Sequence, residues 1–119
     1  MSTRKLTRSE WHRFCDGLSQ RLRDESAELE VVSLALGDHI EAKWLPLYGV
    51  AYDPRADVIE IALQNVDHMI EQPRDVTVEE TPRGLVAIEI TTADERHEIL
   101  KLRRPLRLAA GAPEDGEEQ

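Results

Sequence analysis

Three histidines have the residue type and spacing that best suit metal chemistry in this chain. His39, His68 and His97 are separated by 29 residues each, and each is predicted to begin the second strand of a hairpin. If those strand ends met at one rim, three imidazoles would supply the ligand number of a catalytic zinc site. The spacing provides no local chelate, so a polar residue beside a turn is the simpler interpretation of each histidine. They are weak metal candidates, and we assign no cofactor.

A thiol and an imidazole lie one helical turn apart near the amino end of the chain. His12 and Cys15 could form a thiolate–imidazole pair if both faced the same side. On a helical wheel, however, Cys15 lies in the apolar stripe, whereas His12 lies ~60° away and four residues before Asp16. We therefore expect Cys15 to pack as a small hydrophobic residue and His12 to pair with Asp16 on the surface. No catalytic residue is assigned.

Carboxylates are abundant, but their positions indicate a solvated face. Glu60, Glu79 and Glu89 alternate with apolar residues in predicted strands, so we expect these side chains to face water, where their pKa values need no shift. The sequence contains no Gly-x-Ser-x-Gly segment, no His-Glu-x-x-His segment and no glycine-rich phosphate loop. A hydrolytic enzyme is therefore the least favoured functional hypothesis.

The elements that must position these residues begin with a helix. Thr7 precedes Glu10 by three residues, which is the spacing of a capping box, and Leu6 and Trp11 are placed for a hydrophobic staple. We expect a helix over 8–24 that buries an apolar stripe against a sheet. The stripe consists of Trp11, Phe14, Cys15, Leu18 and Leu22.

After residue 27 the apolar period changes from that of a helix to that of a strand. Turn signals rich in Gly, Pro and Asp separate the apolar segments, and such short connections join antiparallel neighbours. The sequence therefore predicts an α+β fold in which the helix packs on a curved, mostly antiparallel sheet of about six strands, arranged as a meander or partial barrel. The predicted strands are 28–36, 39–52, 58–64, 68–80 with a break near Pro73, 85–92 and 97–104.

The composition changes after Pro105. The last residues are small, polar or acidic and include no aromatic or β-branched side chain. Such a composition cannot bury enough apolar surface to offset the entropy of ordering. We expect a single α+β domain over 1–105 and a disordered acidic tail over 106–119.

Two groups of residues are candidates for an interaction surface. The segment 44–52 is apolar on both faces and contains a proline and a glycine that favour a bulge. Its aromatic residues either complete the core or form an exposed patch for a partner or second copy. The basic residues of the last strand suggest an edge protected against pairing, or a stripe for an acidic partner. The candidates are Trp44, Tyr48, Tyr52, Lys101, Arg103 and Arg104.

Length and charge exclude several classes of protein. The chain has 119 residues, a formal net charge of −9 and one cysteine, so we expect one domain, no internal disulfide and poor attraction to nucleic acid. Its longest stretch without a charged residue has nine residues, whereas a membrane-spanning helix needs ~20. Its first residues contain no apolar core of a secretory signal. We expect a cytoplasmic protein that binds neither membrane nor nucleic acid.

Several short motifs together carry a family resemblance. They are Thr7-Arg-Ser-Glu-Trp followed by Phe14, Leu45-Pro-Leu-x-Gly, His68-x-Ile-x-x-Pro and Leu102-Arg-x-Pro. In this order and spacing, they resemble a family of small uncharacterised prokaryotic proteins with a domain of unknown function. The resemblance covers roughly 6–105, implies a complete single-domain protein and brings no activity with it.

Three functional hypotheses follow. The leading one is a non-enzymatic interaction or accessory module, which could form a homodimer through an edge strand or the 44–52 segment. The second is a small-ligand or metal-binding domain that uses His68 with His39 and His97. The third is a hydrolytic enzyme, which remains open because a fold does not determine chemistry.

Overall fold

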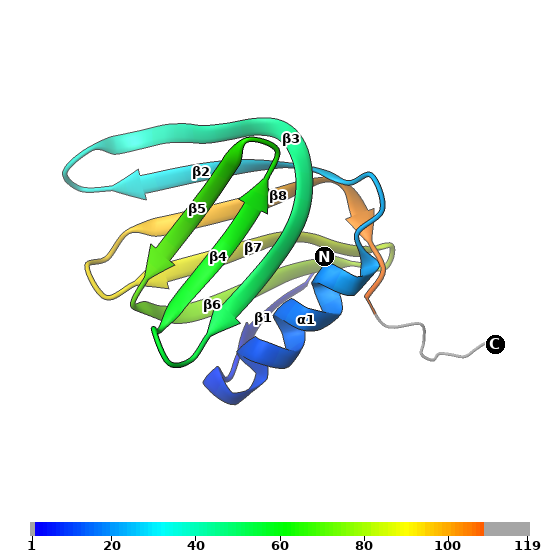
Figure 1. The fold of residues 1–119 in the computed structure, drawn as a ribbon, viewed down its shortest axis with the longest axis horizontal. Coiled ribbons are helices and arrows are strands. Elements are labelled where there is room, and N and C mark those ends of the chain that lie inside the picture. The colour runs from blue at the N-terminus through cyan, green and yellow to red at the C-terminus, as the bar shows by residue number, and fades with distance from the viewer. Residues whose placement is uncertain (1, 109–119) are drawn as a thin grey trace.

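The computed structural model describes residues 2–108 of the chain. Within this range one short helix packs on an open antiparallel sheet of eight strands (Figure 1). The sheet order is β1-β6-β7-β8-β2-β3-β4-β5. The elements are β1 (Ser2–Leu6), the 3-10 turn η1 (Arg8–Glu10), α1 (Trp11–Arg21), β2 (Ser26–Ser33), β3 (Gly37–Asp53), β4 (Val58–Leu63), β5 (Val66–Glu71), β6 (Pro73–Thr81), β7 (Gly84–Thr92) and β8 (His97–Leu106).

The predicted helix is present and buries the predicted stripe. Its start is capped as expected, because the Thr7 N–H donates to Glu10 Oε1 at 2.8 Å. Regular α-helix ends at Arg21, since Leu22 is already extended and Asp24 has a positive φ of 58°. The predicted end at residue 24 was therefore three residues too late. Trp11, Cys15 and Leu18 are buried against the sheet.

Eight strands replace the six that were predicted. The first additional strand is β1, which pairs with β6 at one edge and exposes every side chain except Leu6, so it has no apolar alternation to reveal it. The second arises because the predicted break near Pro73 in the strand 68–80 separates two strands, β5 and β6, at Gln72 with φ 53°. The order is also not a simple meander, because β8 returns to pair with β2 and β6 pairs with β1.

The predicted bulge in the 44–52 segment is confirmed, and it makes β3 serve two parts of the sheet. The first half of β3 pairs with β2 and the second half with β4, with register shifts in both ladders. Trp44 has φ 52° in the irregular part of the ladder with β2, and Pro46, which cannot donate to a ladder, is the last residue of β3 paired with β2. As a result β3 curves, and β4 and β5 lie over β6, β7 and β8 (Figure 1).

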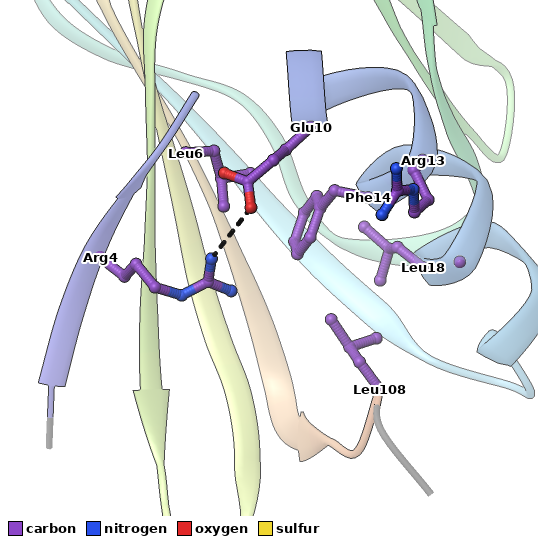
Figure 2. Close-up of a pocket in the computed structure, with 8 residues that line it drawn as sticks. Arg4, Leu6, Glu10, Arg13, Phe14, Leu18 and Leu108 are labelled. Carbon is purple, nitrogen blue, oxygen red and sulfur yellow. Dashed lines mark ion pairs between the residues drawn. The ribbon is translucent and has the colours of Figure 1, made fainter. Parts of the chain in front are cut away.

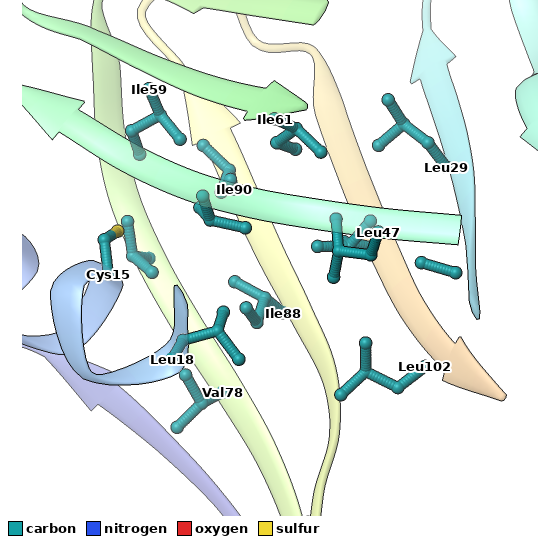
Figure 3. Close-up of a cluster of buried hydrophobic side chains, with 14 of the residues drawn as sticks. Cys15, Leu18, Leu29, Leu47, Ile59, Ile61, Val78, Ile88, Ile90 and Leu102 are labelled. Atoms are coloured by element: carbon teal, nitrogen blue, oxygen red, sulfur yellow. The ribbon is translucent and has the colours of Figure 1, made fainter. Parts of the chain in front are cut away.

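One hydrophobic core fills the space between these layers and the helix (Figure 3). The helix contributes Cys15 and Leu18, the folded-over strands contribute Ile59 and Ile61, and the strands behind contribute Ile90, all nearly inaccessible to water. Nearly every large apolar residue of the alternating segments is used here. The large apolar side chains that remain exposed outside the core are therefore candidates for contacts with a partner.

The last strand lies inside the sheet and extends further than predicted. The last strand was predicted to be an edge, but β8 lies between β7 and β2 and is paired on both sides. Its basic residues therefore do not protect an edge. The strand also continues to Leu106, which is buried. Residues 109–119, with most of the predicted acidic tail, lie outside the described residues.

Candidate functional site

A groove lies between α1 and the sheet, with a cavity volume of about 220 Å³ (Figure 2). Its apolar lining comes from the end of β1, one face of α1 and the residue that follows β8 by two positions. Gly17 of α1 leaves space in this lining, because a Cβ added there would meet nothing within 4 Å. A second hollow shares three of the same residues, Arg4, Phe14 and Leu108, and extends the groove toward the β6–β7 turn. The apolar lining residues are Leu6, Phe14, Leu18 and Leu108.

Arginines surround this apolar groove. Arg4 lies 3.9 Å from Glu10 and 4.0 Å from Glu80, so its charge is shared with two carboxylates. Arg13 and Arg107 have no ion-pair partner among residues 2–108 and lie beside the groove and its extension. The rim is thus locally positive on a chain whose formal net charge is −9. Such a site favours an apolar segment that carries acidic groups.

A second cluster, the mouth cluster, joins the folded-over part of the sheet to β8. His68 Nε2 on β5 lies 2.5 Å from Glu98 Oε1 on β8, and Glu98 is fully buried. Arg96 Nη1 lies 3.4 Å from Glu98 Oε2, an ion-pair contact without hydrogen-bond geometry. The other ring nitrogen of His68 lies 4.0 Å from Glu41 Oε2, and His39 Nε2 lies 3.0 Å from Glu41 Oε1. The mouth cluster consists of His39, Glu41, His68, Arg96 and Glu98.

A third cluster, the corner cluster, ties η1 to the turns after β3 and β5. Arg8 donates to the Tyr52 hydroxyl, to Asp57 Oδ1 and to the Pro73 carbonyl, each at 3.0 Å. Its guanidinium lies 4.4 Å from the ring centroid of Trp11. The Tyr52 hydroxyl donates to Asp57 at 2.9 Å, and burial together with this bond raises the pKa of Tyr52. The corner cluster consists of Arg8, Trp11, Tyr52, Asp57 and Pro73.

The three candidate histidines take different partners. His39 and His68 lie on either side of Glu41, as described above. His97 instead lies 2.8 Å from Glu89 Oε2. Within residues 2–108, no group of three or more His, Cys, Asp or Glu side chains is arranged to hold a metal ion. The histidine metal site thus stays a prediction, and the structure brings together two of its three members around one carboxylate.

The thiol and imidazole of α1 lie where the wheel places them. Cys15 is buried, and burial raises the pKa of its thiol to about 12, so the thiolate is scarce at neutral pH. His12 Nδ1 lies 3.5 Å from Asp16 Oδ2 on the surface, as predicted. Glu60 differs from the expected unperturbed carboxylate, because a hydrogen bond with Asp67 raises its pKa. These residues form no nucleophilic pair.

The six predicted interaction residues differ in their surroundings, and their role in an interaction stays a prediction. Tyr52 is buried with its ring centroid 5.2 Å from that of Trp11, whereas Tyr48 is 62% exposed. Trp44 is half-buried and lies under the guanidinium of Arg103, 5.4 Å from its carbon to the ring centroid. In the same strand, Lys101 lies 3.3 Å from Glu30 and 3.9 Å from Glu28, and Arg104 is exposed.

Sequence reasoning missed the groove and the members of the mouth cluster other than its histidines. One signal was available, because Glu98 shares the parity of Leu100 and Leu102 and therefore faces the core. Its partner on β5 is set by the curvature of β3 and has no local signature. The groove had no signal either, since β1 was not predicted.

Comparisons with known proteins give a family without an activity. A protein of Aquifex aeolicus (strain VF5), described as uncharacterised, is 34% identical over 104 residues, which cover 87% of this chain and 94% of that protein. No solved structure matches the chain. The model of the Family of unknown function (DUF5335) matches residues 2–111. The chain therefore belongs to DUF5335, a family of unknown function, as its resemblance to small uncharacterised prokaryotic proteins indicated.

Proposed function

We propose that this chain is a non-enzymatic, cytoplasmic interaction module that binds an apolar, acidic segment of a protein in the groove beside α1. The observation that carries the proposal is the groove itself, in which Leu6, Phe14 and Leu18 line a space bordered by Arg4 and Arg13. No helix of the described part is long and apolar enough to cross a membrane.

The physical case combines apolar burial with charge. An apolar side chain that enters the groove is removed from water, and complete burial of one such side chain is worth about 1.5–3 kcal/mol. Arg13 and Arg107 favour an acidic group next to it and would speed its approach. A segment with one or two apolar anchors and a nearby carboxylate satisfies both requirements.

Filling the groove from α1 tests the proposal. The probe is 8-anilinonaphthalene-1-sulfonate, which is apolar and anionic, and its fluorescence reports binding. Gly17→Leu fills the groove without a clash at Cβ, and we expect it to weaken probe binding at least about tenfold. Gly17→Ala is the matched control, since it makes the same backbone change and leaves the groove open. Equal binding by the wild type and Gly17→Leu would contradict the proposal.

A second candidate function is the binding of a divalent transition metal at the mouth cluster. It is favoured by the positions of His39 and His68 on either side of Glu41, although these side chains would have to turn toward a shared ion, because they are not arranged around one here. The buried Glu98 would orient the His68 ring, as carboxylates do for metal-bound histidines. Zinc should then raise the unfolding temperature of the wild type but not of His68→Ala. Protein purified without an affinity tag should also contain metal by elemental analysis. If no metal is found and zinc leaves the unfolding temperature of the wild type unchanged, this candidate function is wrong.

A further inference from the structure

The two most exposed of the large apolar side chains in the described range lie on one turn. Leu34 is 96% exposed and Leu36 is 74% exposed in the turn between β2 and β3. The turn has its own geometry, because the Ser33 hydroxyl accepts the Leu36 N–H at 3.0 Å and Gly37 adopts φ 75°. Neither feature requires leucine at 34 or 36. We call the turn that carries Leu34 and Leu36 the leucine turn. Its two leucine side chains add nothing to the core and are exposed as apolar anchors.

The leucine turn and the groove face different ends of the molecule. The β2–β3 hairpin projects at one end of the longest axis, which measures 48 Å, while α1 and the end of β8 lie toward the other (Figure 1). Continuous pairing between β2 and β3 from Ser33 and Gly37 back to Glu30 and Ile40 holds the turn at that end. In the described range, the residues that line a hollow with Leu34 come from β2 and from the β7–β8 end, at Glu95 and His97. The turn of one chain thus cannot enter its own groove, and a contact between them must join two copies.

We infer that the leucine turn of one copy binds in the groove of a second copy. This inference rests on the proposed function and names its partner. Leu34 and Leu36 supply the apolar anchors. On the same hairpin Asp38 and Glu30 are hydrogen-bonded to each other, with Lys101 beside Glu30, and these two carboxyl groups against one ammonium group leave a net negative charge that suits the Arg13 side of the groove. Because each copy carries both a turn and a groove, two copies can bind each other reciprocally as a two-fold dimer, or the contact can continue from copy to copy as a chain or a closed ring.

Complementation between two variants tests this inference. The first variant, Leu34→Ser with Leu36→Ser, removes the anchors, which are too exposed for their loss to disturb folding. The second is Gly17→Leu, which fills the groove. Analytical ultracentrifugation should show that the wild type self-associates with increasing concentration, and that each variant alone does so at least about tenfold more weakly. The controls are Gly17→Ala and Met69→Ser, the latter removing an apolar side chain that is 48% exposed on β5; both should associate like the wild type.

The decisive sample is the mixture of the two variants. The first retains an intact groove and the second an intact leucine turn, so together they should form a 1:1 pair that grows no further. A wild type that stays monomeric at high concentration, or a mixture that stays monomeric, would overturn the inference. If the samples stay monomeric but Gly17→Leu still weakens probe binding, the groove is a binding site and only the choice of a second copy as its partner is wrong. If probe binding is insensitive to Gly17→Leu, the proposed function itself fails.

The acidic end of the same chain is an alternative occupant of the groove, and the same experiments distinguish it from the leucine turn. Residues Glu114, Asp115, Glu117 and Glu118 lie outside the described range and are acidic. Replacement of these four by Gln or Asn should leave self-association and probe binding unchanged if the groove takes the leucine turn. Increased probe binding with unchanged self-association would identify the chain's own end as the occupant and overturn the inference.

Discussion

The mouth cluster and the corner cluster both tie distant strands together with charged side chains, but they do so in different surroundings. In the mouth cluster the carboxylate of Glu98 is fully buried and its partner His68 is 16% exposed. In the corner cluster the side chains of Arg8 and Asp57 are 53% and 39% exposed. Removal of a partner should therefore be costly at the mouth and mild at the corner, because only a buried charge loses its solvation without compensation.

The contrast also separates two ways of fixing a curved sheet. The mouth cluster places a charge between the layers, where apolar side chains of similar volume would pack well, so its retention is not explained by stability alone. The corner cluster instead uses one guanidinium to satisfy a hydroxyl, a carboxylate and a backbone carbonyl at the surface. The arrangement of the corner cluster is typical of a structural contact, whereas the mouth cluster is also a candidate for binding.

His68→Ala should give the largest effect. It removes the closest partner of Glu98, and we expect the free energy of unfolding to fall by about 3 kcal/mol because a charge is left buried with only Arg96 nearby. Urea unfolding followed by far-ultraviolet circular dichroism measures the change. His97→Ala is the matched control, since His97 pairs with Glu89 at the surface and its loss should cost less than about 0.5 kcal/mol. Equal effects of the two substitutions would remove the distinction drawn for the mouth cluster.

Tyr52→Phe should have an intermediate effect at the corner. The substitution deletes a hydroxyl that accepts from Arg8 and donates to Asp57, and leaves the ring packed on Trp11. We expect a loss of about 1 kcal/mol in urea unfolding, the net value of such hydrogen bonds. Tyr48→Phe provides the comparison, because Tyr48 is 62% exposed and its substitution should leave stability unchanged. A loss as large as that of His68→Ala would show that the corner is as demanding as the mouth.

Glu10→Gln should have the smallest effect, and one that depends on pH. The Thr7 backbone N–H lowers the pKa of Glu10 below its ordinary value of 4.5. A carboxylate with a lowered pKa in the folded state stabilises the fold above its ordinary pKa and loses this contribution as pH falls through the folded value. The stability difference between wild type and Glu10→Gln should therefore be present at pH 7 and shrink below about pH 4.5. A difference that is constant with pH would mean that the charge of Glu10 does not support the start of η1.

The local elements were predictable because they have local causes. The capping residues Thr7 and Glu10 start the helix, and the stripe through Trp11 and Leu18 faces the core. Alternation predicted β4 and β7, and the proline and glycine in the 44–52 segment predicted the irregular part of β3. Each of these signals acts over a few residues, which is the range that sequence patterns describe.

The missed features depend on contacts between distant residues. Strand β1 is held by its ladder with β6 and has no apolar alternation of its own. His68 was singled out by type, but its partner Glu98 is 30 residues away and meets it only because β3 bends. The central position of β8 likewise follows from its return to β2. Sequence alone therefore described the pieces of the candidate sites better than their assembly.

The bend in β3 has a consequence for how the molecule comes apart. One continuous backbone, Gly37–Asp53, supplies ladder partners to both halves of the sheet, so neither half retains its full set of interstrand bonds once the other has separated. Slow amide exchange on β2 and on β4 should consequently be lost in a single step of rising denaturant, as one cooperative unit.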